Sequence, residues 1–168
     1  MAMQYHFHSP LGKIRIVASS RGLREVSFPA RALNKAVELK GDSAEVCFIR
    51  EAVKQLNAYF AGKLRNFDVP LDAQGTAFQR RVWSHLRRIP YGQAVAYRDL
   101  AQKMGHPKAA RAVGSANGKN PLCIIVPCHR VISADGGLGG YSAGIKRKAF
   151  LLKHEQKFVS SYGNQYPL

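Results

Sequence analysis

The feature that most constrains the fold is a short apolar run that ends in a proline and leads directly into a cysteine. Ile124 to Val126 are β-branched and apolar, which is typical of a buried strand. Pro127 cannot donate a hydrogen bond to a sheet, so we expect Cys128 at the end of this strand, facing a cleft. The chain therefore has to fold so that a strand end presents a thiol.

Two groups able to activate that thiol follow at once, His129 and Arg130. A free cysteine has a pKa of about 8.5, so only a few per cent is thiolate at neutral pH. Lowering the pKa by two units, which corresponds to about 2.7 kcal/mol, makes the thiolate the majority form. Neighbouring cationic or hydrogen-bonding groups can supply this, so the pattern predicts an activated nucleophile.

The charge of the chain indicates what the thiol acts on. Of 168 residues 46% are hydrophobic, enough for a core, yet the net charge is +16. Residues 1–76 hold 11 Lys and Arg against 7 acids, a balance of +4, whereas residues 77–168 hold 15 against 3, a balance of +12. The half with the cysteine motif is the basic half, which favours a polyanionic partner such as nucleic acid.

Three cysteines and no apolar N-terminal signal segment favour a reducing, cytoplasmic setting. No run approaches the roughly 20 apolar residues of a membrane span, so we expect no membrane association. Cys123 and Cys128-His129 could suggest zinc, but a structural site needs four ligands at paired spacing, and only Cys47 and scattered histidines remain. We predict no metal and no cofactor.

The first part of the chain alternates as strands do, at 4–8, 13–18 and 23–28, with turn residues between the runs. This predicts a short antiparallel meander. A helix follows, because apolar residues recur at spacings of three and four, at Val46, Ile49, Val53, Leu56 and Phe60. We place the first domain at 1–74.

The second part, 75–157, is expected to be mostly helical. Thr76 can cap a helix that ends before 90–92. Helices at 97–104 and 109–117, separated by Gly105-His106-Pro107, make a helix-turn-helix. A last helix is expected at 146–155 and a tail at 158–168.

The helix at 109–117 is rich in alanine, glycine and serine, so its backbone can approach a surface closely, and Arg111 projects from it. A helix inserted into a DNA groove has this character, although many such helix pairs only pack against each other. The charge asymmetry makes DNA binding the favoured interpretation.

Glu155 falls at the predicted C-terminal end of the last helix, where the helix dipole disfavours a carboxylate by some tenths of a kcal/mol. A histidine partner would explain it. Cys128, His129 and Glu155 would then be a nucleophile, a base and the group that orients the base.

The whole pattern resembles the O6-alkylguanine-DNA alkyltransferases, the methylated-DNA-protein-cysteine methyltransferases. Five blocks between residues 76 and 155 carry the resemblance: Pro-Cys-His-Arg-Val at 127–131, Arg-Ala-Val-Gly at 111–114, Asn-Pro at 120–121, Gly-Tyr-Ser at 140–142 and Leu-Leu-Lys-His-Glu at 151–155. It implies an α+β fold: a small N-terminal, ribonuclease H-like antiparallel sheet with a helix, then a mostly helical, winged-helix-like domain with the helix-turn-helix and the active-site strand.

The resemblance also implies an enzyme that repairs alkylated double-stranded DNA as a monomer. Cys128 would take the alkyl group from O6-alkylguanine, and from O4-alkylthymine, once and irreversibly. His129, acting through a water, would deprotonate it and Glu155 would hold the histidine tautomer. Asn120 would order the turn behind the site, and Tyr97 would donate to guanine N3 as the base leaves.

For DNA contact the resemblance implies that Arg111 fills the base stack when the damaged nucleotide is turned out. The DNA-binding residues it implies are Arg111, Tyr97, Arg98, His106, Ser115, Tyr141, Ser142 and Lys148. Ser142-Ala143 would leave room for alkyl groups larger than methyl.

Two alternatives remain open from the sequence. A cysteine hydrolase would use the same three side chains, but would need an oxyanion hole and no basic, small-residue helix. A DNA-binding module without catalysis, like the alkyltransferase-like proteins, would keep the helix-turn-helix but lack the acceptor cysteine, and Cys128 counts against it.

Overall fold

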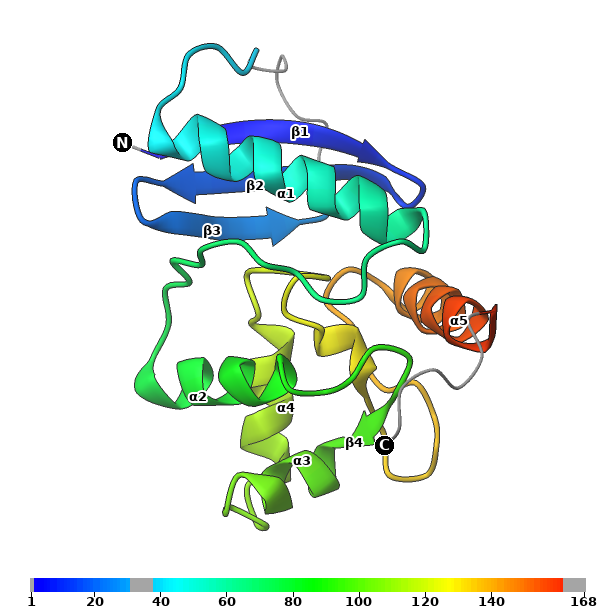
Figure 1. The fold of residues 1–168 in the computed structure, drawn as a ribbon. Coiled ribbons are helices and arrows are strands. Elements are labelled where there is room, and N and C mark those ends of the chain that lie inside the picture. The colour runs from blue at the N-terminus through cyan, green and yellow to red at the C-terminus, as the bar shows by residue number, and fades with distance from the viewer. Residues whose placement is uncertain (1, 31–37, 162–168) are drawn as a thin grey trace. The chain divides into compact units, whose positions relative to one another are not determined.

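A computed structural model describes residues 2–30 and 38–161. The chain divides into two units (Figure 1): one comprises residues 1–75 together with 121–125, and the other residues 76–120 together with 126–168. A small antiparallel sheet with a helix is followed by a mostly helical part. The expected α+β class is therefore confirmed.

The first unit is a meander covered by a helix. Strands β1 (Met3–Ser9), β2 (Gly12–Ser19) and β3 (Gly22–Ser27) pair antiparallel in that order. Helix α1 (Ala44–Phe60) lies across the sheet (Figure 1), and the Ser43 side chain caps its N-terminus. The core between them is made of fully buried side chains, namely Ile14, Ile16, Leu23, Val26, Ile49, Leu56 and Tyr59.

The run before the cysteine corrects the first expectation, because it is buried but is not a strand. Leu122 forms an isolated bridge with Val26, and the Cys123 N–H donates to the Val26 carbonyl at 2.8 Å. Ile124 then has φ of 73° and begins a turn. A β-branched residue with positive φ is strained, and this backbone cannot continue a strand. The apolar residues of the run are therefore explained by the burial of their side chains and not by sheet pairing. The turn lies where the chain passes from the first unit to the second.

The second unit begins with α2 (Ala77–Leu86), capped as predicted by Thr76 in a reciprocal capping box with Gln79. It continues with β4 (Val95–Ala96), α3 (Tyr97–Lys103) and α4 (Ala110–Gly118). A 3₁₀ turn, η1 (Cys128–Arg130), leads into β5 (Val131–Ile132), which pairs parallel with β4. The helix-turn-helix made of α3 and α4 is present where it was expected.

The last helix, α5 (Ile145–Ser161), is longer than predicted. Part of the predicted tail, 158–161, is helical, and 162–168 lie outside the described residues. The helix continues because Val159 packs closely on the turn at Gly92, where an added Cβ would come within 2.4 Å of the valine Cγ2. Glu155 is therefore inside the helix, and the dipole argument for its partner was wrong.

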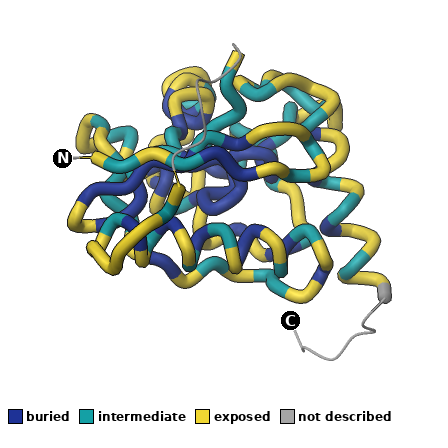
Figure 2. Tube along the Cα trace, turned by 90° about the horizontal axis from the view of Figure 1, so that it is seen from above, coloured by how far each residue is buried: buried dark blue, intermediate teal, exposed yellow. Residues whose placement is uncertain are grey.

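The longest buried stretch of the described chain runs from Leu122 to Val131, and Figure 2 marks buried segments in dark blue. It holds Cys128, His129 and Arg130, so the reactive motif belongs to the interior of the fold. Within residues 2–30 and 38–161, no helix is both long and apolar enough to cross a membrane.

Candidate active site

The cysteine sits on a backbone that two buried amides hold. Cys128 is 2% exposed and begins η1. Asn117 Nδ2 donates to the Cys128 carbonyl at 3.3 Å, and Asn120 Nδ2 donates to the Val126 carbonyl at 2.8 Å. Each carbonyl also accepts a backbone N–H, that of Cys128 at 2.8 Å for Val126 and that of Val131 for Cys128, so each amide adds a second donor to its oxygen. The two amides therefore fix the position of the thiol, and Asn120 orders the chain just before the cysteine.

Behind the cysteine lies a buried charge cluster centred on the Glu155 carboxylate. His129 Nε2 donates to Glu155 Oε1 at 2.7 Å. Arg130 donates two hydrogen bonds to the same carboxylate, from Nε at 2.9 Å and from Nη2 at 2.9 Å. Its Nη1 donates to a different acceptor, the Ile89 carbonyl, at 2.7 Å. The Gly92 N–H adds a fourth hydrogen bond at 3.1 Å. The three side chains are at most 4% exposed, so water cannot supply their hydrogen bonds. The charges and polar atoms of His129, Arg130 and Glu155 therefore depend on one another for partners.

The geometry also fixes the histidine tautomer. Because Nε2 faces a carboxylate, Nε2 carries the hydrogen and Nδ1 of a neutral ring is an acceptor. That Nδ1 is buried and has no hydrogen-bond partner among the described residues. The site therefore holds a base nitrogen free to take a proton, on a ring that Glu155 orients.

The surroundings shift both groups toward these roles. Burial lowers the pKa of His129, and the charges of Arg130 and Lys148 lower it further. The hydrogen bond and charge of Glu155 raise the pKa, but not enough to bring it back to its usual value. For Glu155, burial would raise the pKa, but the hydrogen bonds and charges of His129 and Arg130 outweigh it and hold the pKa far below its usual range. At neutral pH the pair is a neutral imidazole beside a carboxylate.

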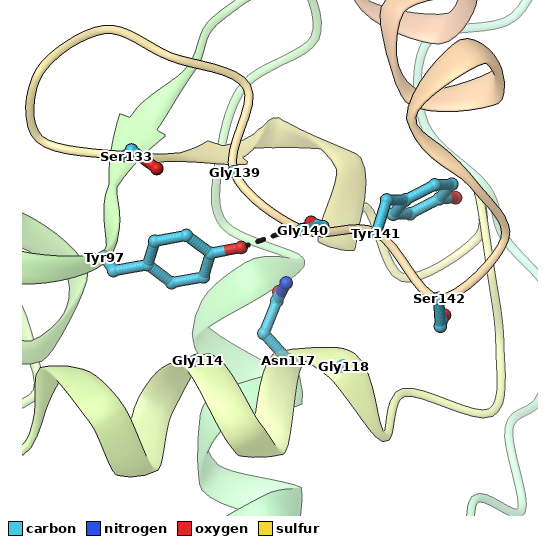
Figure 3. Close-up of a pocket in the computed structure, with 9 residues that line it drawn as sticks. All are labelled: Tyr97, Gly114, Asn117, Gly118, Ser133, Gly139, Gly140, Tyr141 and Ser142. Atoms are coloured by element: carbon cyan, nitrogen blue, oxygen red, sulfur yellow. Dashed lines mark hydrogen bonds between the residues drawn. The ribbon is translucent and has the colours of Figure 1, made fainter.

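A cavity of about 370 Å³ opens at Asn117, the residue that donates to the Cys128 carbonyl. Figure 3 shows the residues that line it, which come from α3, α4 and the segment 133–142: Tyr97, Gly114, Asn117, Gly118, Ser133, Gly139, Gly140, Tyr141 and Ser142. The Tyr97 hydroxyl and the Asn117 amide face the same part of the cavity. The predicted residues Tyr97, Tyr141 and Ser142 are thus brought together in one pocket.

Two glycines lie next to the Tyr97 ring, and Gly139 approaches it more closely than Gly114. A Cβ on Gly139 would come within 3.2 Å of a ring carbon, and one on Gly114 within 3.6 Å. The Tyr97 hydroxyl donates to the Gly140 carbonyl at 3.5 Å. Burial raises the pKa of Tyr97, and so does the nearby Cys128, while a hydrogen bond from Asn117 opposes them. The phenol therefore keeps its proton and can act as a donor.

Lys148, which the resemblance places among the DNA-binding residues, lies beside the pocket segment at Gly140. It is fully buried, and its Nζ donates to the Val131 carbonyl at 2.6 Å and the Gly140 carbonyl at 3.1 Å. An ammonium held in this way cannot reach a phosphate without losing both partners. In this structure Lys148 contacts the pocket wall, and its contact with DNA stays a prediction.

The other predicted DNA-binding residues lie on the surface of the second unit. Arg111 and Ser115 are exposed on α4, and Arg98 and His106 are exposed at either end of α3. Arg98 is 3.4 Å from the Asp99 carboxylate, and His106 is 3.4 Å from Arg81, which the sequence analysis did not single out.

Sequence reasoning missed two residues of the site. Arg130 was read as a cation that acts on the thiol, whereas its charge is bound to Glu155. Asn117 was read only as part of the small-residue helix. A polar amide among the small residues of that helix, three residues before Asn120, was an available signal.

Comparison with known proteins agrees with this site. The family model described as 6-O-methylguanine DNA methyltransferase, DNA binding domain, matches residues 77–157, and the model of the ribonuclease-like domain matches residues 3–73. The chain belongs to the 6-O-methylguanine DNA methyltransferase family. The methylated-DNA--protein-cysteine methyltransferase of Methanosarcina acetivorans is 49% identical over 150 residues, which is 89% of this chain and 95% of that protein. The Mycobacterium tuberculosis protein of the same name is 61% identical over 105 residues, 62% and 64% of the two chains.

Solved members of this methyltransferase family have the same fold. The M. tuberculosis O6-methylguanine methyltransferase superposes with a TM-score of 0.78 at 43% identity, covering 96% of this chain and 99% of that one. A structure of the M. tuberculosis protein in complex with DNA superposes with a TM-score of 0.79, covering 91% and 92%. The resemblance drawn from the five sequence blocks is confirmed.

Proposed function

We propose that this methyltransferase repairs duplex DNA by moving the alkyl group of O6-alkylguanine, and of O4-alkylthymine, to its own Cys128. The observation that carries the residue assignment is a buried cysteine adjoining a buried histidine that has its Nε2 on a carboxylate and its Nδ1 unengaged. Family membership supports the reaction, since curated relatives are methylated-DNA--protein-cysteine methyltransferases.

The reaction follows from these groups. The Cys128 thiol gives its proton to His129 Nδ1, through a bridging water, and Glu155 stabilises the imidazolium that forms. The sulfur attacks the alkyl carbon in line, so the carbon–sulfur bond forms as the carbon–O6 bond breaks. The electron pair goes to guanine, and Tyr97 donates its proton to N3. One proton transferred through solvent from the imidazolium to the tyrosinate restores both side chains.

The sulfur is not regenerated in this scheme. A thioether has no carbonyl that water could attack, unlike the acyl-enzyme of a cysteine hydrolase. One molecule therefore repairs one lesion.

Delivery of the lesion requires that the base leave the duplex, because the O6 carbon inside a base stack cannot be reached in line by a buried thiol. Extrusion costs a few kcal/mol. Exposed Arg111 on α4 is suited to fill the vacated stack, and the pocket at Tyr97 and Tyr141 to receive the base. The excess of basic residues supports binding to the phosphate backbone.

We further propose that the protein works in the cytoplasm as a monomer, without metal or cofactor, with its domains at 1–74 and 75–157. No disulfide joins the three cysteines, and a reducing compartment would keep them in that state.

Intact mass spectrometry after mixing with O6-methylguanine duplex DNA tests the proposal. We expect a gain of one methyl group, localised by peptide mapping to Cys128 and absent from Cys128→Ser. Methylation of Cys47 or Cys123 in its place would overturn the assignment. Repeated turnover of an acyl substrate by the same cysteine would favour the hydrolase alternative.

A further inference from the structure

Lys148 is a buried charged group beside the pocket to which the proposed reaction assigns no role. Its side chain is fully buried, and burial lowers its pKa, against the opposing influence of Cys128. No ion pair is found between Lys148 and an acid of the described residues; its Nζ donates to two carbonyl oxygens. Burying an ammonium without a counter-charge costs free energy, which two hydrogen bonds to neutral carbonyls offset only in part. We therefore asked which function Lys148 has at this position.

One of those carbonyls is shared with Tyr97. The Gly140 oxygen accepts from Lys148 Nζ at 3.1 Å and from the Tyr97 hydroxyl at 3.5 Å. The first distance is that of a good hydrogen bond, and the second lies at the outer limit. The Gly140 oxygen therefore accepts a stronger hydrogen bond from Lys148 than from the Tyr97 hydroxyl.

The rest of the tyrosine has little freedom. As described above, Cβ atoms on Gly139 and Gly114 would both contact its ring. Gly139 also has φ of 70°, a conformation that favours glycine. Figure 3 shows the hydroxyl directed across the cavity to the segment at Gly140. The position of that segment therefore decides where the phenol hydrogen points.

Lys148 also ties the same segment to the sheet. Its second acceptor, the Val131 carbonyl, belongs to β5, the strand that follows η1 and pairs with β4 directly before Tyr97. One ammonium thus bridges the strand next to the nucleophile and the wall opposite the phenol, and it lies 5.8 Å from the centre of the Tyr97 ring.

We propose that Lys148 is a positioning residue of alkyl transfer, which holds the Gly140 carbonyl so that the hydrogen of the Tyr97 hydroxyl is donated to it only weakly. The phenol hydrogen is then free to move to the departing guanine. This inference rests on the proposed function, because it concerns the donor step of that reaction.

The test is a double-mutant cycle on single-turnover methyl transfer, measured over a range of O6-methylguanine duplex concentrations. Each variant yields a rate constant at saturation and a half-saturating DNA concentration. Lys148→Met keeps the length of the side chain and removes the ammonium. We expect its saturated rate constant to fall about 30-fold, within what a general acid contributes, with the half-saturating concentration changed less than about threefold.

The control is Lys146→Met, which removes an exposed charge from the same helix. Its rate constant is expected to change less than about twofold, as for surface charges in general. In the Tyr97→Phe background, Lys148→Met should cost at most about threefold, because residues that act through one another are not additive.

Equal losses with and without the tyrosine hydroxyl would overturn the inference, since they would show a purely structural lysine. A raised half-saturating concentration with an unchanged rate constant would overturn it in favour of a DNA contact. If Lys148→Met does not fold, the cycle is run with Lys148→Arg, which keeps the charge but moves the donors, and the same criterion of additivity applies. Wild-type protein that gains no methyl on Cys128 would instead refute the proposed function.

Discussion

The second unit has charged side chains in two different environments, one buried and one exposed. Around Glu155 the charged side chains are buried, close and mutually hydrogen-bonded, with distances of 2.7 to 2.9 Å. On α3 and α4 the cations are exposed, as at Arg98, Lys103 and Arg111. Buried pairs depend on every partner, whereas exposed charges act nearly independently and are screened by salt. Chemistry and DNA affinity should therefore respond differently to mutation.

The largest effect is expected from Glu155→Gln. An amide cannot hold the His129 tautomer as a carboxylate does, and it leaves the Arg130 charge buried without a counter-charge. We expect the methyl-transfer rate to fall about 10²- to 10⁴-fold and the free energy of unfolding to fall about 3–5 kcal/mol. Single-turnover kinetics and denaturant unfolding measure both.

The matched control is Glu45→Gln in the first turn of α1, where a carboxylate contributes less than about 1 kcal/mol. A similar loss of stability in both variants would contradict the view that the Glu155 cluster is held by mutual pairing.

Arg111→Ala tests the exposed surface. Removing the side chain that fills the stack should slow repair of duplex lesions about 10- to 100-fold, since extrusion of a base costs a few kcal/mol. Reaction with the free base O6-methylguanine should be unchanged. Comparing the two substrates in the same assay decides the matter, because equal losses on both would remove Arg111 from base extrusion.

Acid should weaken the buried cluster in two stages. The lowered pKa of His129 means that the unfolded chain takes up a proton more readily below about pH 6.5, so stability falls as the pH drops through that value. The depressed pKa of Glu155 gives stability that is present above about pH 4.3 and lost as the pH falls further toward its folded pKa.

Between about pH 7.5 and 5.5 we therefore expect the free energy of unfolding to fall by about 1 kcal/mol. His6, whose pKa burial also lowers, contributes with the same sign, so His6→Asn is measured alongside. An unchanged pH slope in His129→Asn would show that His129 is not responsible.

The smallest effect is expected from a single exposed cation such as Lys108. Lys108→Ala should weaken DNA binding about two- to threefold and reduce the slope of log affinity against log salt by about one if it contacts a phosphate. The rate constant at saturating DNA should not change. Fluorescence anisotropy at several salt concentrations gives the slope, and a lowered saturated rate would contradict the separation of the two regions.

Much of the fold could be predicted because local signals agreed with it. The meander follows alternation, and α2 follows its capping box at Thr76. The run at Ile124 was misread because β-branched apolar residues predict burial in any backbone, and only the structure shows the turn with φ of 73°. The end of α5 was misplaced because the contact that extends it, Val159 on Gly92, joins residues far apart in the sequence.

The site could be predicted as far as the residues adjacent in sequence or shared with the family motif. The sequence grouped Cys128, His129 and Glu155, and the structure brings the last two together at 2.7 Å. The hydrogen bonds of Arg130 to the same carboxylate were not predicted, since they depend on the direction of the arginine side chain. Lys148 was placed among the DNA-binding residues by the resemblance, and its burial beside two carbonyls could not be predicted because the sequence does not reveal them.

The central claim is that the sulfur of Cys128 is consumed. The most direct test mixes the protein with a several-fold excess of O6-methylguanine duplex and counts repaired guanines per protein molecule over time. The account predicts a plateau at one, with S-methylcysteine recovered only at Cys128. Continued repair beyond one guanine per molecule would contradict it.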